Sequence, residues 1–322
     1  MSRDPRPTDD REIPPADLRM LARARSQARR EHRFDEADRI RAEIEAQGWK
    51  VVDRGAEARL VRAHPHDVVE ADGVTRYGWT GAVPSDGGAE GVPAADPTAI
   101  TVVVRALPKV EATDSLVARL TGGGTRPRHV LVVAGEDRPD PTLDGTDVIR
   151  MRGEVRPGTL LAVALRRVAD GVVVVGERWP ADATPDDIDA LAARLGDPEV
   201  AVAGLDGLRS DDLRRFRAGS GADTPVEAVG WAGLAFRAVD ARARGEVDEG
   251  FNDADLLAAW WSLVLRDDPD SAAPRRALAL RASEAAPDDA LRDDRATRRD
   301  RYRLIDSFAG RDDLLVGGGH GA

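Results

Sequence analysis

VVVVGERWPADATPDDIDALAARLGDPEVAVA, residues 172–203, is the stretch that decides the fold. Two short apolar runs, Val172–Val175 and Val200–Ala203, flank a segment with the apolar spacing of a helix that starts at Pro185. Thr184 supplies an N-cap, and the proline and two acids that follow suit the first turn of a helix. The stretch therefore predicts a strand, a helix and a second strand in succession.

The same alternation extends along the chain from Ile100 onward. It predicts an α/β fold in which a mostly parallel sheet carries helices on both faces. The mixed segment Val226–Val239 predicts two strands or a strand and a turn, and a helix is expected to start at Asp211. The other expected strands are Ile100–Val104, Val130–Val133 and Val148–Met151, and the other expected helices are Asp114–Leu120, Gly158–Ala169, Pro185–Leu195, Asp253–Arg266 and Asp288–Phe308.

The N-terminal part has a different pattern. Its two amphipathic segments, Asp17–Glu31 and Asp35–Gln47, are separated by so few residues that we expect two antiparallel helices. A β-hairpin is expected next, with strands Trp49–Asp53 and Ala58–Arg62. The predicted organisation is a disordered stretch at 1–15, the helical hairpin with its β-hairpin at 16–63, an irregular linker at 64–98, the α/β domain at 99–310 and a flexible tail at 311–322.

Composition excludes several classes of function. The 322 residues contain no cysteine, which excludes disulfides, thiolate catalysis and cysteine-based zinc sites. The 58 acidic and 47 basic residues give a formal charge of −11, which argues against nucleic-acid binding through bulk electrostatics. No apolar run is long enough to span a bilayer and no secretory signal opens the chain, so the expected location is cytoplasmic.

A motif late in the chain points to a family. Residues 231–237 read WAGLAFR and residues 245–251 read GEVDEGF. Together they resemble the pattern "G..L.FRR......G.FDE.F" of family 2 glycosyltransferases, which have the GT-A fold, and the resemblance extends over about residues 99–268. It implies a nucleotide-sugar donor at the carboxyl ends of the parallel strands, a divalent metal (Mn or Mg) on an Asp-x-Asp, and a carboxylate that acts as general base.

The resemblance also assigns roles to individual residues. Asp253 or Asp255, which follow the motif, would be the general base. Glu177 stands where the family has Asp-x-Asp and would be the remaining metal or diphosphate-side acid, while Arg178 beside it would replace the metal as the cation for the diphosphate.

The other assigned residues lie in two acidic pairs. Glu136 and Asp137, which follow the second strand, would contact the nucleotide, and Asp248 and Glu249 would shape the acceptor loop.

The N-terminal hairpin resembles a second family. Phe34, Ala37-Asp38, Ile40-Arg41 and Gly48 match the C-terminal end of cysteinyl-tRNA synthetases. The zinc cysteines and the His-x-Gly-His and Lys-Met-Ser-Lys-Ser type signatures of those enzymes are absent, so the chain does not charge tRNA with cysteine. One helix face carries Arg19, Arg23 and Arg30, which fits a solvated face and leaves RNA contact as an alternative.

Two principal functions follow from these observations. The first is a family 2-like glycosyltransferase that uses a nucleoside diphosphate sugar and an acceptor that the sequence does not identify. The second is a non-catalytic binding or scaffold protein of the same descent, a pseudoenzyme. It is suggested by the single acid that remains where the family has Asp-x-Asp. Loss of the metal would remove several kcal/mol of stabilisation of the transition state. An RNA-associated protein that acts through the hairpin is a third interpretation.

Overall fold

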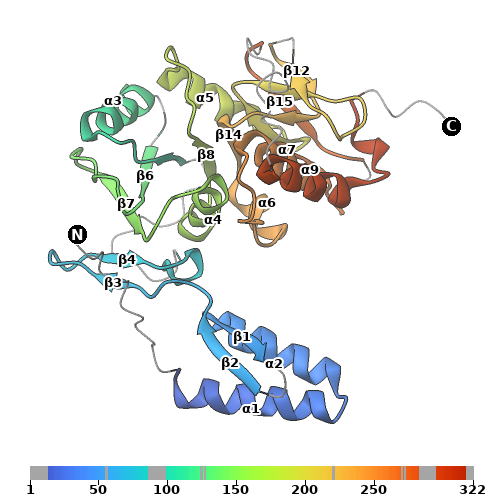
Figure 1. Ribbon diagram of the computed structural model, residues 1–322. Coiled ribbons are helices and arrows are strands. Elements are labelled where there is room, and N and C mark those ends of the chain that lie inside the picture. The colour runs from blue at the N-terminus through green and yellow to red at the C-terminus, as the bar shows by residue number, and fades with distance from the viewer. Residues whose placement is uncertain are drawn as a thin grey trace, which may run out of the picture. The chain divides into compact units, whose positions relative to one another are not determined.

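The computed structural model describes residues 14–54, 57–85, 99–123, 126, 128–219, 222–269, 271, 273–282 and 295–316. The chain divides into two compact units, Met1–Asp67 and Val68–Ala322 (Figure 1). Four expected features lie wholly or partly outside the described residues: the disordered N-terminal stretch, the second half of the linker, the start of the last helix and the glycine tail.

The first unit is a helical hairpin followed by a β-hairpin, as the sequence predicts. Its elements are α1 (Ala16–Arg30), α2 (Phe34–Ala46), β1 (Trp49–Arg54) and β2 (Glu57–Arg62), with β1 and β2 antiparallel. Its core is formed by Leu18, Ala22, Ile40, Ile44 and Trp49. The first helix begins one residue before Asp17, whose acid therefore lies in the first turn and not at the N-cap.

The second unit contains a sheet of ten described strands in the order β12-β15-β9-β14-β8-β5-β6-β7-β4-β3. Seven of these described strands run in one direction, and β12, β14 and β3 run in the other. The predicted α/β class with a mostly parallel sheet is confirmed. In sheet order, the strands are Thr224–Val226, Arg276–Ala279, Val200–Gly204, Ala232–Arg237, Val172–Gly176, Ile100–Arg105, Arg128–Ala134, Thr146–Met151, Thr75–Tyr77 and Val68–Val69.

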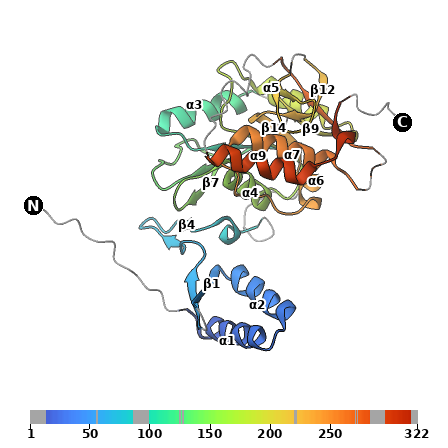
Figure 2. The same ribbon diagram turned by 45° about the vertical axis from the view of Figure 1, so that its right-hand side comes forward.

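Helices cover both faces of this sheet (Figures 1 and 2). Successive strand residues point to opposite faces, so Val102 packs in one core and Val103 in the other. The first core includes Leu116 of α3 and Leu191 of α5, and the second includes Leu160 of α4 together with side chains of α6 and α7. These helices are α3 (Val110–Thr121), α5 (Pro185–Arg194), α4 (Pro157–Arg167), α6 (Ala238–Ala243) and α7 (Ala254–Arg266).

The C-terminal helix α9 (Arg295–Phe308) packs beside α7 (Figure 2). A buried cluster joins Leu304 and Phe308 of α9 to Leu263 of α7. The short helix η2 (Asp312–Leu314) follows and contributes its buried Leu314 to the same cluster. The end of the described chain is thus part of the packed fold.

A turn between two strands of a smaller three-stranded sheet stands where a helix was expected from Asp211. This sheet has the order β11-β10-β13, with strands Arg217–Ala218, Gly207–Arg209 and Ala228–Val229. The expectation is wrong because Asp212 uses its Oδ1 to accept the backbone N–H groups of Arg214 and Arg215 at 2.9 and 3.1 Å. Such side chain–backbone bonds favour a turn over a helix.

Part of the segment that the sequence leaves irregular belongs to the large sheet. Strand β4 pairs in parallel with β7 and β3 pairs with β4, and the short helix η1 (Thr80–Ala82) follows. Arg76 of β4 donates from Nη1 to the carbonyls of Gly135 and Met151 at 3.1 and 3.2 Å. Strands of two and three residues are too short to show an apolar period, which explains why the sequence pattern does not reveal them.

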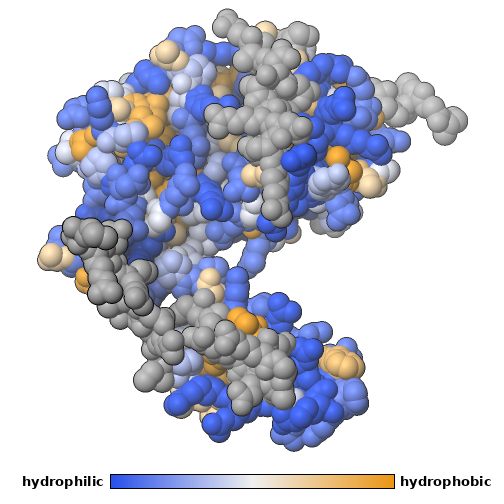
Figure 3. All heavy atoms as spheres, viewed as in Figure 1, coloured by the Kyte–Doolittle hydropathy of each residue, from blue (hydrophilic) through white to orange (hydrophobic). Residues whose placement is uncertain are grey.

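The surface in Figure 3 is mainly hydrophilic, with scattered apolar residues. Val69 on β3 and Val239 on α6 are among the exposed large apolar side chains. Within the described part of the chain, we find no helix with the length and apolarity needed to cross a lipid bilayer.

A matched pair of valines tests the position of the core. Val173 on the central strand β8 is fully buried, whereas Val69 on the edge strand β3 is 69% exposed. We expect Val173→Ala to lower the free energy of unfolding by about 2 kcal/mol, because it leaves a cavity between the sheet and a helix. Val69→Ala should change it by less than about 0.5 kcal/mol. Urea denaturation measures both values, and equal losses would contradict this sheet order.

Candidate functional site

The order of the strands places a topological switch point, called the crevice below, at the carboxyl edge of the sheet. From β5 the chain adds β6 and β7 on one side, and then crosses back to place β8 on the other side. Open α/β sheets bind ligands where successive connections diverge in this way. In this protein the crevice lies between the ends of β5 and β8, where Val104 is level with Gly176.

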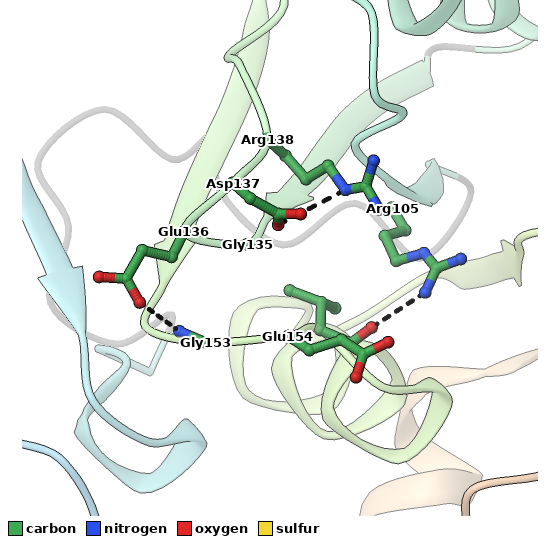
Figure 4. A pocket seen from close by; sticks show the side chains of 8 residues that line it. Arg105, Gly135, Glu136, Asp137, Arg138, Gly153 and Glu154 are labelled. Atoms are coloured by element: carbon green, nitrogen blue, oxygen red, sulfur yellow. Dashed lines mark hydrogen bonds and ion pairs between the residues drawn. The ribbon is translucent and has the colours of Figure 1, made fainter. Parts of the chain in front are cut away.

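A pocket of about 470 Å³ opens beside this crevice (Figure 4). Its walls are Arg105 at the end of β5, residues 135–138 after β6 and residues 153–155 after β7. Hydrogen bonds tie these walls together: Glu136 exchanges bonds with Gly153, and Arg105 donates from Nη1 to the carbonyl of Val155 at 3.2 Å. The candidate nucleotide residues Glu136 and Asp137 therefore line one pocket together with the cation Arg105.

Two glycines allow the pocket loops to approach each other. A Cβ atom at Gly135 would lie 2.9 Å from the carbonyl oxygen of Gly153, and Gly153 itself has a φ of +76°. A side chain at the first position would force the loops apart, and a side chain at the second would strain the backbone. The pocket thus depends on glycine at both positions.

Glu177 connects the pocket to the crevice. Its carboxylate lies 3.5 Å from the Nε atom of Arg105, and its side chain is 10% exposed. Burial raises the pKa of Glu177, and the charges of Arg105 and Arg178 act in the opposite direction. The ion pair spans the crevice, because its two members follow adjacent strands.

Arg178 forms an ion pair with the N-terminus of α7. Its Nη2 atom lies 2.5 Å from Oδ2 of Asp255, which is in the first turn of that helix. Asp253 is the N-cap of α7, and its Oδ1 atom accepts the backbone N–H groups of Asp255 and Leu256, both at 3.0 Å. Burial raises the pKa of Asp253. The two candidate bases therefore meet the loop that carries Glu177 and Arg178.

The C-terminal helix α9 holds the segment just before α7 through hydrogen bonds. Asp300 of α9 is fully buried, and its Oδ2 atom accepts the backbone N–H groups of Asn252 and Asp253 at 2.7 and 2.8 Å. A carboxylate that accepts two backbone N–H bonds orients the chain just before a helix. Asp300 thus holds Asp253 in place without reaching the crevice through its own side chain.

Asp206 is a member of the site that our sequence analysis did not identify. It follows the strand β9, and the backbone N–H of Gly230 donates to its carbonyl at 3.1 Å. Burial, and then the nearby charge of Asp255, raise its pKa to about 6, whereas its own backbone and Arg178 act in the opposite direction. The sequence does carry a signal for it, because it is an acid directly beyond a buried parallel strand.

The predicted acceptor loop is held by its own two acids. Asp248 accepts the backbone N–H of Gly250 at 2.8 Å, and Glu249 accepts a hydrogen bond from the hydroxyl of Thr80. A Cβ atom at Gly158 would lie 2.7 Å from the Cα atom of Glu249, so this loop lies directly on the start of α4. Its role toward an acceptor stays a prediction.

The acids of the site do not form a metal centre in this arrangement. Among the residues that the structure describes, no group of three histidine, aspartate or glutamate side chains could hold a metal ion. Glu177 pairs with Arg105 and Asp255 pairs with Arg178, so both acids already face a cation. The divalent metal implied by the family resemblance therefore does not fit these residues as they lie.

No family model and no curated protein matches the chain, so the resemblance of the hairpin to cysteinyl-tRNA synthetases has no support from them. Among solved structures the chain is similar to the mannosyltransferase PcManGT from Pyrobaculum calidifontis, in complex with GDP-Man and Mn²⁺, with 17% identity and a TM-score of 0.38. The match covers 58% of this chain and 56% of that one, about half of its length. Similarity this low establishes neither a shared activity nor residue correspondences.

The electrostatics of Asp206 lead to a stability prediction. Its folded-state pKa of about 6 lies above the ordinary 3.8, so the folded protein binds this proton more tightly than the unfolded chain does. The contribution of Asp206 to stability is therefore complete below pH 4 and is lost as the pH rises through 6. We expect Asp206→Asn to be more stable than the wild type by up to about 3 kcal/mol at pH 8, and to be similar to it at pH 4.

Denaturation by urea at pH 4, 6 and 8 measures this difference. Asp144→Asn is the matched control, since Asp144 is exposed and precedes β7 at the opposite edge of the sheet. A gain in stability that is the same at all three pH values, or that also appears in the control, would contradict the electrostatic account of Asp206.

Proposed function

We propose that the second unit binds a nucleoside diphosphate sugar at the carboxyl edge of its sheet and transfers the sugar to an acceptor hydroxyl, in the manner of a family 2-like glycosyltransferase. One observation carries the proposal: charged side chains from the ends of β5, β8 and β9 and from the start of α7 converge beside a pocket. The location is the one that open α/β sheets use for nucleotide ligands.

The pocket suits the nucleoside end of such a donor. Its volume of about 470 Å³ falls in the range of small-molecule sites. Glu136 and Asp137 offer carboxylate oxygens to ribose hydroxyls and to base N–H groups. Arg105 lies between this pocket and Glu177, so a nucleoside there would direct its diphosphate toward a guanidinium, which binds phosphate oxygens in a bidentate manner.

The charge of the crevice limits how the diphosphate is held. Glu177, Asp206 and Asp255 face the two guanidinium groups of Arg105 and Arg178, with Asp253 close by. Four acids against two bases leave an excess of negative charge when all are ionised. A diphosphate is therefore accommodated when a guanidinium turns from its carboxylate to the phosphate, or when a buried carboxyl takes up a proton.

The sequence motif lies at the same place. The residues WAGLAFR span the antiparallel strand β14, which runs between β8 and β9, and GEVDEGF leads into α7. Sugar transfer then requires the acceptor oxygen to bond to the anomeric carbon while the bond to the diphosphate breaks, and a carboxylate to take the acceptor proton. Asp253 and Asp255 are the candidates that the family resemblance implies.

Nucleotide binding tests the proposal. We expect UDP or GDP to bind, with Arg105→Ala and Arg178→Ala each weakening binding about tenfold or more, because each removes a charge-assisted contact to phosphate. Isothermal titration calorimetry with both nucleotides, in EDTA and in Mn²⁺, measures the affinities. Arg214→Ala is the control, since Arg214 is exposed and lies on the turn after β10.

The outcomes separate the alternatives. If neither nucleotide binds in either buffer, the proposed function is wrong. Binding that Arg105→Ala and Arg178→Ala leave unchanged would place the nucleotide elsewhere. Binding without any release of nucleoside diphosphate from sugar donors would identify a non-catalytic binding protein, and a thermal shift with tRNA alone would favour the N-terminal hairpin as the functional part.

A further inference from the structure

Each of the two carboxylates that the family resemblance offers as general base already uses one of its oxygens within the fold. Oδ2 of Asp255 lies 2.5 Å from Nη2 of Arg178, with which it forms an ion pair. Asp253 uses Oδ1 to cap α7 through two backbone N–H groups, and its own backbone N–H is bound by Asp300. A general base needs an oxygen that is free to accept a proton from the substrate.

Asp206 differs from both of them. Its Oδ1 atom is buried and has no hydrogen-bond partner among the residues that the structure describes. The side chain follows β9 at the same sheet edge as the residues after β8, and it lies within electrostatic reach of Arg178 and Asp255. A buried carboxylate oxygen without a partner is costly, and a functional role is one of the reasons for which proteins retain such a group.

The backbone around Asp206 leaves space for this carboxylate. A Cβ atom at Gly230 would lie 2.4 Å from Oδ2 of Asp206, so a larger residue at that position would displace this carboxylate. The N–H of Gly230 donates to the carbonyl of Asp206 at 3.1 Å, which fixes the turn between β9 and β10. The turn that carries Asp206 is therefore bound to the segment before β14, and the glycine at position 230 leaves room for the carboxylate.

We propose that Asp206 is the carboxylate that accepts the proton of the sugar acceptor. The inference rests on the proposed function. The acceptor oxygen forms a bond to the anomeric carbon, the bond from that carbon to the diphosphate oxygen breaks, and the diphosphate leaves with the electron pair. The proton of the acceptor hydroxyl passes to an Oδ atom of Asp206, and no further reactant is required.

The surrounding charges suit this role. Two charged groups act on Asp206: Asp255, from the first turn of α7, and Arg178, from the loop after β8. Because Arg178 is ion-paired with Asp255, it compensates part of the negative charge that would otherwise oppose the ionisation of Asp206. The resulting pKa of about 6 lies near neutral pH, where a carboxylate is ionised and still has a useful affinity for a proton.

The first experiment observes the proton directly. Carbon-13 NMR of protein labelled at the aspartate carboxyl carbon, recorded from pH 4 to pH 8, should show one resonance that titrates near pH 6. Asp206→Asn should remove that resonance, and Asp206→Glu should remove it while keeping a carboxyl group in place. A resonance near pH 6 that persists in both variants overturns the proposal, and so does its absence from the wild-type protein.

The second experiment uses water as the acceptor. Release of UDP from UDP-glucose and of GDP from GDP-mannose is measured between pH 5 and pH 8, beside binding of UDP and GDP. For the wild type we expect a rate that rises with pH and levels off above pH 6. Asp206→Asn should release nucleotide about 100-fold to 10,000-fold more slowly and without this rise, while it still binds the nucleotide.

The variants and outcomes then distinguish the two proposals. The exposed control Asp144→Asn should preserve both the rate and its rise near pH 6. A wild type that binds neither nucleotide refutes the proposed function. If the protein binds nucleotide and Asp206→Asn releases it from the donor at the wild-type rate and with the wild-type pH profile, Asp206 is not the proton acceptor. The same follows if the wild type binds nucleotide but releases none from either donor. In both cases the proposed nucleotide site remains valid.

Discussion

The ion pair between Arg178 and Asp255, with 2.5 Å between Nη2 and Oδ2, is the interaction on which the candidate site depends. It joins the loop after β8 to the first turn of α7, two segments far apart in the sequence. It also places one positive charge among the acids Glu177, Asp206 and Asp253, which without it would repel one another in a partly buried environment. Burial raises the pKa of all three acids, and the positive charge of Arg178 acts in the opposite direction on each of them.

Hydrogen bonds to buried charged groups also hold the C-terminal segment in the fold. The side chain of Glu227 is almost fully buried, and it accepts the backbone N–H groups of Ser210 and Val316 at 3.1 and 2.8 Å. Burial lowers the pKa of Arg266 to about 10, and this guanidinium donates to the carbonyl of Glu227 at 2.6 Å. The segment that ends at Val316 includes α9, whose Asp300 orients the start of α7. Packing at the end of the chain therefore determines the position of a candidate site residue.

Much of the fold followed from local patterns. The valine runs of β5 and β8 predicted buried parallel strands, and Thr184 with the proline and two acids that follow it predicted the start of α5. The structure shows both. The helix expected at Asp211 does not form, because an aspartate suits the start of a turn as well as the start of a helix. Strands β3 and β4 were not predicted, because two or three residues are too few to show an apolar period. Asp206 was not predicted, because an acid after β9 belongs to the site only through the strand order that brings it near Asp255 and Arg178.

By itself the sequence determined where strands and helices form, because apolar periodicity and capping act between residues a few positions apart. It also determined that acids and arginines follow several strands. Only the tertiary structure decided which of these charges meet, because the order β9-β14-β8-β5-β6 is set by packing between distant segments. That order places Arg105 next to Glu177 and brings Asp206 within reach of Asp255. The pairing of charges in the crevice is thus a property of strand order, which no local pattern encodes.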